Sequence, residues 1–228
     1  MSTIKTNQLA HTANGASEYT LPQTDGSFGQ QLQTNGSGGL SWSTPNQPDY
    51  VKLAQGEQAS YGQSNLIFEN LNVATYKFFD LVAFLRPSND AVSLFFRYRE
   101  GGASGSDITG NSYSLGFNEK KDANTSNCTA EGPTQKMILT GSIGNHASEG
   151  VGISMRISVA RTNDISTAKW LANMASWNAV YREQGNAARM TNGQGHLYDD
   201  TKYPTGFSLY FDNGNVQAYS YTLYGIRG

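Results

Sequence analysis

Apolar and polar residues alternate along most of the chain after about residue 50. The clearest case is the segment 151–159, which has an apolar side chain at every odd position and glycine, serine or arginine at every even position. A period of two is typical of a β-strand with one buried and one solvated face. The segment therefore predicts a strand whose outer face meets water.

Several other segments between turn signals also have strand character. Residues 76–85 carry apolar side chains on both faces, which predicts a central strand buried on two sides. Residues 91–100 alternate, and we expect them to form its hairpin partner with one wetter face. Shorter strands are predicted at 64–69 and 112–117, and the polar run 118–134 is interpreted as a long loop.

The segment 170–181 can be read in two ways. Trp170, Met174, Trp177 and Tyr181 follow a helical spacing better than strict alternation. The β pattern around the segment favours a strand or bent strand pair, with Trp170 and Trp177 on opposite faces of a sheet. We predict a strand.

The last segment, 205–228, predicts a hairpin with Asn213 and Gly214 at its tip. An Asn-Gly pair supplies the positive φ angles of a type I′ turn, the strongest short-range hairpin signal.

The first 43 residues are much poorer in apolar groups. Ordering a residue costs about 1–2 kcal/mol of backbone entropy, so such an arm needs copies of itself or a partner surface to bury its few apolar side chains. Two prolines, Pro45 and Pro48, mark 44–50 as a linker before a domain at 51–228. The residues predicted to mediate assembly are Ile4, Leu9, Leu21, Phe28, Leu32, Leu40 and Trp42.

Composition supports an all-β fold and narrows the function classes. The chain has 228 residues, with 25 glycines, 13 tyrosines and 10 phenylalanines but only 15% charged residues, as expected for short antiparallel strands joined by tight turns. The formal charge is −2 without a basic cluster, so neither nucleic acid nor a membrane surface is an expected partner. Residues 1–7 lack the apolar core of a signal peptide, and we expect synthesis in a cytoplasm.

Residues for catalysis or metal binding are sparse. There are three histidines and a single cysteine, Cys128, which we interpret as a free thiol, and no metalloprotease, phosphate-loop or nucleophile-elbow motif. A glycosidase needs two carboxylates facing across a cleft. Asp199 and Asp200 are adjacent and would point apart, and Asp80 is interpreted as a structural acid. We therefore expect no enzyme, no metal and no cofactor.

Carbohydrate binding is the chemistry that remains. Aromatic rings stack on the apolar faces of sugars, and amide, carboxylate and imidazole groups bond to their hydroxyls. The sequence around a presumed turn at 193–195 offers such groups, although two tryptophans in a β-sandwich are more often core residues. The candidate ligand-binding residues are Trp177, Tyr181, His196, Tyr198 and Asp199.

The arm resembles a known family. The residues Asp25-Gly26, Gly29-Gln30, Leu32, Thr34-Asn35-Gly36, Gly38 and Leu40-Ser41-Trp42 are similar to a segment near the N-termini of bacteriophage fibre and appendage proteins. The pattern Gly206-Phe207, Phe211, Gly214-Asn215-Val216 and Leu223-Tyr224-Gly225-Ile226 resembles the closing hairpin of their jelly-roll, concanavalin-A-like domains. The resemblance implies a homotrimer in a virion, whose arm contacts other virion proteins.

The sequence therefore predicts a tail fibre or similar appendage that attaches to a host-surface glycan through its C-terminal domain. One alternative is a head fibre, decoration or connecting protein that serves assembly or stability without a receptor. A surface-polysaccharide depolymerase is a second alternative, which the scattered acids disfavour.

Overall fold

The computed structural model describes residues 8–10, 18–45, 49–120, 126–159, 173–184, 187–199 and 201–227. The chain divides into two compact units, Met1–Pro48 and Asp49–Gly228. The described residues contain no α-helix, only one short 3₁₀ turn at Gly102–Ser104, and thus no helix that could cross a membrane. Antiparallel strands account for the rest of the regular structure, which confirms the predicted all-β fold.

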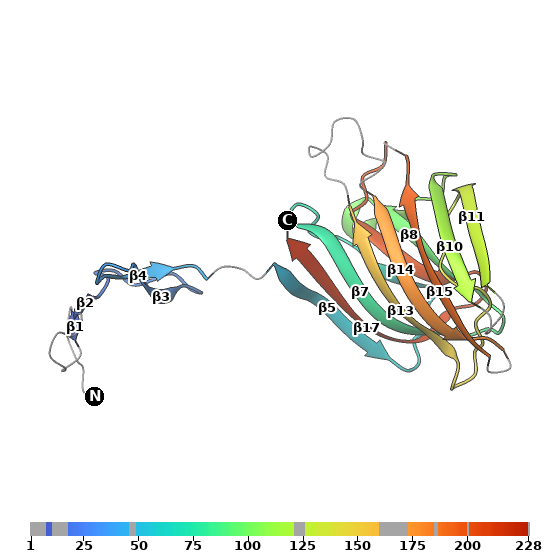
Figure 1. The fold of residues 1–228 in the computed structure, drawn as a ribbon, viewed down its shortest axis with the longest axis horizontal. Helices are drawn as coiled ribbons and strands as arrows, with labels where there is room; N and C mark the ends of the chain where they lie inside the picture. The colour runs from blue at the N-terminus through green and yellow to red at the C-terminus, as the bar shows by residue number, and fades with distance from the viewer. Residues whose placement is uncertain are drawn as a thin grey trace. The chain divides into compact units, whose positions relative to one another are not determined.

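The larger unit is a β-sandwich built from two sheets (Figure 1). The larger sheet has eight strands in the spatial order β11-β10-β15-β14-β13-β7-β17-β5, so β11 and β5 are its edges. In chain order these strands are β5 (Tyr50–Gln58), β7 (Tyr76–Pro87), β10 (Tyr113–Lys120), β11 (Ser126–Thr134), β13 (Gly150–Ser158), β14 (Met174–Arg182), β15 (Ala188–Leu197) and β17 (Val216–Arg227).

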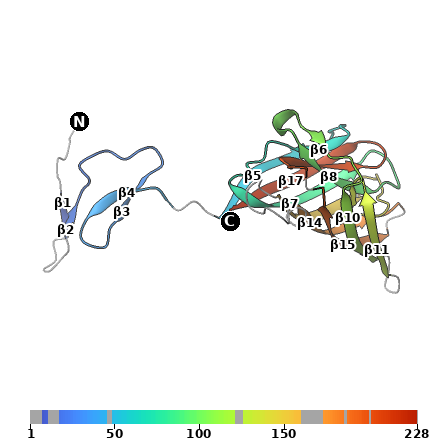
Figure 2. The same cartoon turned by 90° about the horizontal axis from the view of Figure 1, so that it is seen from above.

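The smaller sheet has five strands in the order β12-β8-β16-β6, with β9 added beside β8. Viewed along the layers, β6 and β8 lie on one side of the domain and β14 and β15 on the other (Figure 2). The strands are β6 (Asn65–Phe68), β8 (Leu94–Glu100), β9 (Ser106–Asp107), β12 (Met137–Ile138) and β16 (Gly206–Phe211).

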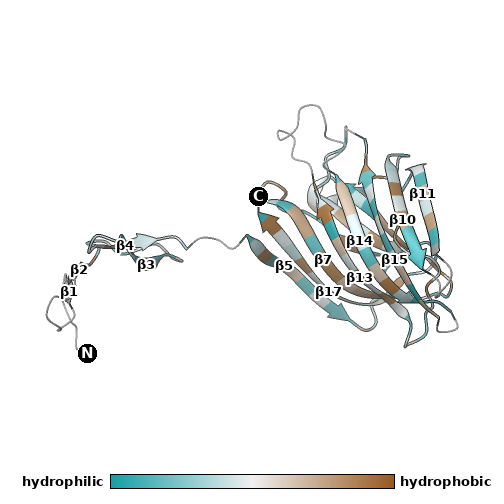
Figure 3. Cartoon of the chain, viewed as in Figure 1, coloured by the Kyte–Doolittle hydropathy of each residue, from teal (hydrophilic) through white to brown (hydrophobic). Residues whose placement is uncertain are grey.

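One hydrophobic core fills the space between the sheets. The strand β13 shows why the sequence folds this way: from Val151 onward its odd-numbered residues are buried and its even-numbered residues face out, as predicted from the alternation. Burial alternates in the same way along β14, and brown apolar bands are interleaved with paler ones along strands of the larger sheet in Figure 3. Each fully buried aliphatic or aromatic side chain contributes about 1.5–3 kcal/mol, so the two layers stabilise each other.

Buried tyrosines also tie the two layers together through hydrogen bonds. The Tyr113 hydroxyl in β10 accepts the Tyr98 backbone N–H of β8 at 3.0 Å and donates to the Ile108 carbonyl at 3.0 Å. The Tyr98 hydroxyl donates to the Ser158 carbonyl at the end of β13, at 2.9 Å. Burial raises the pKa of both hydroxyls, which therefore stay protonated and able to donate.

The strand predicted at 76–85 exists and is central, but the expectation that it is buried on both sides is wrong. β7 lies between β13 and β17, and its residues Phe79, Leu81 and Leu85 face the core. Phe78, Val82 and Phe84 lie on its other face and are exposed. The sandwich has only two layers, so nothing within the described part of the domain covers the outer face of β7.

The predicted pairing of 91–100 with β7 is also wrong. β8 belongs to the smaller sheet, where it pairs with β16, β12 and β9. Its supposedly wetter face is largely covered: Phe95 and Arg99 are buried. Arg99 forms ion pairs with Glu69 and Asp107 at 2.5 Å each, which satisfies a charge that would otherwise be costly to bury.

The polar run 118–134 is not the predicted loop. β10 continues to Lys120, and Ser126–Thr134 forms the edge strand β11, which pairs with it from Lys120 back to Tyr113. A polar sequence can form this strand because β11 lies at the edge of the sheet, with one neighbouring strand and a free edge exposed to water. The predicted strand at 170–181 is confirmed as β14 for residues 174–181, whereas Trp170 and its expected orientation lie outside the described residues.

The closing segment is two strands, as predicted, but not a hairpin. β16 pairs with β6 and β8 in the smaller sheet, and β17 pairs with β5 and β7 in the larger one. The connection therefore passes from one layer to the other. Gly214 has a positive φ of 83°, but Asn213 does not, so the type I′ turn is absent.

The first unit contains two small two-stranded sheets. β1 (Gln8–Ala10) pairs with β2 (Glu18–Thr20), and β3 (Gln31–Thr34) pairs with β4 (Leu40–Ser43). The tight turn between β3 and β4 uses Gly36 and Gly38 at positive φ, and the Asn35 side-chain oxygen accepts the N–H groups of Ser37 and Gly39.

Trp42 explains why the N-terminal unit has a glycine at position 26. Trp42 Nε1 donates to the Thr24 carbonyl at 2.7 Å, and its ring lies so close to Gly26 that a Cβ there would come within 2.5 Å of it. Among the predicted assembly residues, Leu21 and Leu40 are half-buried, and Phe28, Leu32 and Trp42 are exposed. Ile4 and the Leu9 side chain lie outside the described residues.

Candidate ligand-binding site

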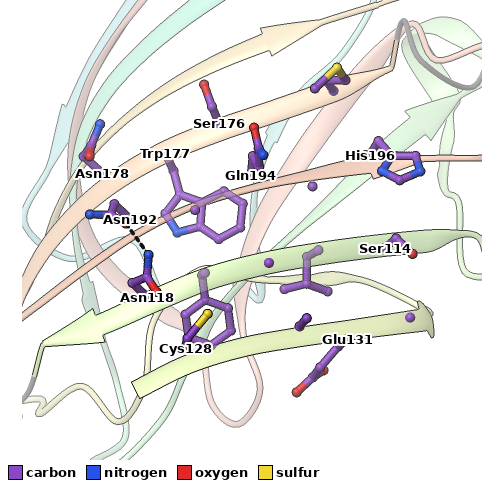
Figure 4. A pocket seen from close by; sticks show the side chains of 18 residues that line it. Ser114, Asn118, Cys128, Glu131, Ser176, Trp177, Asn178, Asn192, Gln194 and His196 are labelled. Atoms are coloured by element: carbon purple, nitrogen blue, oxygen red, sulfur yellow. Dashed lines mark hydrogen bonds between the residues drawn. The ribbon is translucent and has the colours of Figure 1, made fainter. Parts of the chain in front are cut away.

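A large hollow of the sandwich lies on the outer face of the eight-stranded sheet, away from the core (Figure 4). It has a volume of about 910 Å³ and crosses β11, β10, β15 and β14. We call it the amide groove, because its most prominent side chains are amides: Asn118, Asn178, Asn192 and Gln194.

The strand register places three asparagines side by side. Asn118 of β10 is opposite Asn192 of β15, which is opposite Asn178 of β14. Directly opposed residues of an antiparallel pair point to the same face. The Asn118 side-chain amide donates to the Asn192 carbonyl oxygen at 3.4 Å, as drawn in Figure 4. The result is a row of amides that runs across the strands.

A second row, parallel to the first, has small residues on β11, β10 and β14 and an amide on β15. Gly116 of β10 is opposite Gln194 of β15, which is opposite Ser176 of β14. On the other side of Gly116 the opposed residue of β11 is Ala130. Gly116 has no side chain and Ala130 has only a methyl group, so the space above β10 and β11 stays open and forms part of the hollow.

Gly116 is not required by packing. A Cβ at this position would meet only the Thr129 carbonyl oxygen at 3.8 Å, which is an ordinary contact, and its φ is not positive. Glycine weakens the interior of a strand, and one that packing does not require often marks close approach of a ligand. By contrast, a Cβ at Gly193 would lie 2.5 Å from both Phe117 and Trp177 in the core. Gly116 therefore keeps the groove open, whereas Gly193 makes room for the core.

Much of the hydrogen-bonding capacity in the groove is free. Within the described part of the chain, the side chains of Ser176, Asn178 and Gln194 form no hydrogen bond, although all three are polar and exposed. Amide groups both donate and accept, and hydroxyls do the same. The groove can therefore exchange hydrogen bonds with a ligand that carries many hydroxyl or amide groups.

The groove is almost uncharged. Among the residues that the structure describes, Glu131 is the one acid that lines it, and no lysine or arginine does. Burial lowers the pKa of the His196 imidazole, which favours the neutral form of the ring. The described residues contain no cluster of three histidine, cysteine or acidic side chains that could hold a metal ion. The amide groove therefore suits binding of a polar, uncharged molecule.

Trp177 and Tyr181 are not available for the ligand role predicted for them. Both face the core and are only 2% exposed. Trp177 Nε1 donates to the Leu139 carbonyl at 3.0 Å, and the Tyr181 hydroxyl donates to Glu119 and accepts the Gly141 N–H. On an alternating strand, residues four apart share one face, and here that face is the inner one.

The other three predicted residues are near one end of the groove. His196 lines it, and its ring lies 6.2 Å from that of Tyr198. Tyr198 and Asp199 lie past the end of β15 and do not line the groove: the Tyr198 hydroxyl donates to the Asn111 carbonyl, and Asp199 accepts hydrogen bonds from Thr201. The presumed turn at 193–195 lies within β15.

Sequence reasoning missed the residues that form most of the groove, namely Ser176, Asn178, Asn192, Gln194 and Gly116. A signal existed, because polar residues alternate with apolar or small ones over 176–179 and 192–197. The sequence does not show that Asn118 aligns with Asn192 and Asn178. β10 is more than 50 residues from β14 and β15 in the chain, and only the folded sheet brings these strands together.

We compared the chain with protein-family models, curated proteins and solved structures, and none of them matches it. The site is therefore interpreted from its own residues and geometry.

Proposed function

We propose that this protein is a bacteriophage fibre or similar virion appendage that attaches to a host-surface glycan through the amide groove of its β-sandwich, which we assign to the jelly-roll group. The row of Asn118, Asn192 and Asn178 beside the open Gly116 position carries this proposal. Glycans present hydroxyls at closely spaced positions, and an uncharged groove with unused amides and hydroxyls matches that chemistry.

The N-terminal unit supports an assembly role. Phe28 is fully exposed, and Leu32 and Trp42 are each about 40% exposed within this small unit. Burying such side chains against copies of the chain would contribute about 1.5–3 kcal/mol each. We propose a homotrimer, whose arm also contacts other virion proteins. Three linked sites can raise avidity by about 10²–10⁴ without a stronger single site.

A glycan array probed with the full-length protein tests the binding proposal. We expect signals for neutral glycans, and we expect Asn192→Ala and Gly116→Gln to weaken them, because the first removes an amide and the second fills the groove. Gln33→Ala is the matched control, since Gln33 is an exposed amide of the first unit. The proposal fails if no glycan binds at millimolar concentration.

The single cysteine provides a test of where the ligand binds. Cys128 is exposed and lines the amide groove opposite Asn118. Coupling a bulky maleimide to this thiol should block glycan binding, whereas Cys128→Ser should bind normally before and after the same treatment. Unchanged binding by the labelled protein would place the ligand elsewhere.

A decoration or connecting protein without a receptor is the second candidate, and another part of the same sheet face favours it. Val180 and Phe84 are exposed on either side of Gly152, where a Cβ would also find space. Such an apolar strip suits contact with another protein. Retention of the protein by capsid or tail proteins, lost in Val180→Ser/Phe84→Ser but kept in Asn192→Ala, would support this candidate.

A depolymerase is the least favoured function. Retaining or inverting cleavage needs two facing carboxyl groups, and within the described part of the chain only Glu131 lines the amide groove as an acid. We expect no release of reducing ends from host polysaccharide.

A further inference from the structure

A second hollow adjoins the amide groove on the same sheet face. It has a volume of about 340 Å³ and crosses β14, β13, β7 and the start of β5. Ser176 and Asn178 line both hollows, so the two hollows meet at these side chains. We call the second one the tyrosine hollow, because Tyr50 forms its far end. Its lining residues are Tyr50, Asp80, Val82, Ser154, Met155, Arg156, Ser176 and Asn178.

Tyr50 presents an aromatic surface at that end. Its ring stacks on Tyr224 with centroids 4.6 Å apart and planes 25° from parallel, and the side chain is 48% exposed. Tyrosine pairs supply a rigid apolar face at little entropic cost, and the apolar face of a sugar ring packs against such a surface.

The centre of the tyrosine hollow holds a neutralised charge pair. Arg156 donates to both carboxylate oxygens of Asp80, at 2.8 and 2.7 Å. This is the acid interpreted above as structural. Because the two charges cancel, the hollow attracts no anion strongly, but outward-facing N–H groups and oxygens of the pair can bond to hydroxyls.

We propose that the two hollows form one continuous trough that binds a neutral, linear glycan lying across the strands, with its end on Tyr50. This inference rests on the proposed function and adds the ligand's shape, charge and direction. Counting both hollows, the acidic lining residues are Glu131 and Asp80 and the basic one is Arg156. Without an excess of positive charge, an acidic polymer gains nothing over a neutral one.

The length of the trough sets the expected length of the ligand. From β11 to β5 there are seven steps between neighbouring strands. At about 4.8 Å a step the trough spans about 34 Å. A short oligosaccharide fills only the larger amide groove, whereas a longer one also reaches the tyrosine hollow.

Calorimetry with soluble oligosaccharides tests the trough. The ligands are neutral linear glucans, mannans, galactans and N-acetylglucosamine oligomers of two to eight units, with oligogalacturonate as the acidic comparison. For the series that binds, we expect affinity to rise about 10-fold or more between two and six units and then level off, since two contact regions are joined in one ligand. The oligogalacturonate series should bind no better.

Variants at the two ends separate the inference from the function on which it rests. Tyr50→Ala should weaken binding of the six-unit ligand about 3- to 10-fold and leave the two-unit ligand unchanged, whereas Tyr50→Phe, which keeps the ring, should match the wild type. Equal affinity for short and long ligands, or a Tyr50→Ala variant that binds like the wild type, would overturn the trough. No binding by any oligosaccharide would instead overturn the proposed function.

Discussion

Glycines at two neighbouring strand positions have opposite roles in this sheet. Gly116 faces the amide groove and has space for a Cβ, whereas Gly193 faces the core, where a Cβ would collide with Phe117 and Trp177. Gly116→Ala should raise the free energy of unfolding by about 0.4–1 kcal/mol, because alanine reduces the entropy of the unfolded chain. Gly193→Ala should lower it by about 1–3 kcal/mol through overpacking. Urea denaturation measures both. Equal effects would contradict the assignment of Gly116 to the ligand rather than to packing.

Trp177 is a core residue that joins the two layers. Its indole N–H donates to the Leu139 carbonyl, which also accepts the Thr191 hydroxyl at 2.6 Å. Trp177→Phe removes one hydrogen bond and part of a buried ring, and we expect it to lower the free energy of unfolding by about 1–3 kcal/mol. Met174→Phe, on an exposed position of the same strand, should change stability much less. A strong stability loss only in the second variant would contradict this orientation of β14.

His196 should make stability depend on pH. Burial lowers its pKa in the folded protein below the ordinary value of 6.5, so the unfolded chain takes up a proton first as the pH falls. The contribution of His196 is therefore fully present above about pH 6.5 and is lost as the pH falls below it. We expect the difference in Tm between wild type and His196→Gln to shrink on acidification from pH 8 to pH 5. A difference that stays constant or grows would contradict the lowered pKa.

At the scale of elements, the connection between β16 and β17 shows how a strong local signal can mislead. Asn213-Gly214 predicts a hairpin, yet the two strands lie in different layers and only Gly214 has a positive φ. A Cβ at Gly214 would also approach Ser88 Oγ to 2.5 Å. Gly214→Ala should therefore lower the free energy of unfolding by about 1–2 kcal/mol, measured by urea denaturation. Asn213→Ala is the control, and a larger loss there would indicate that the turn depends on Asn213 instead.

The sequence predicted strands well and sheet membership poorly, for a physical reason. Alternation within 151–159 reports one buried face directly, and β13 has that face. Whether two consecutive strands pair or cross to the opposite layer depends on partners distant in the chain, as with β7 and β8. The prediction of the ligand-binding residues failed for the same reason. Aromatic residues were taken as ligand contacts, but Trp177 and Tyr181 fill the core, and the amides that line the groove come together only through pairing of β10, β15 and β14.

At the scale of the whole molecule, the question is what the first unit does for the second. The unit 49–228 has a core of its own, whereas the unit 1–48 leaves Phe28, Leu32 and Trp42 exposed. We therefore expect light scattering to give the mass of a trimer for the full-length protein and of a monomer for a chain lacking residues 1–43. Phe28→Ser/Leu32→Ser should weaken the trimer, because it removes apolar surface that contact with other chains would bury. Gln33→Ser, at the exposed position next to Leu32 on β3, should not. A full-length monomer would contradict assembly through the arm, and a trimer in both chains would place the association in the β-sandwich instead.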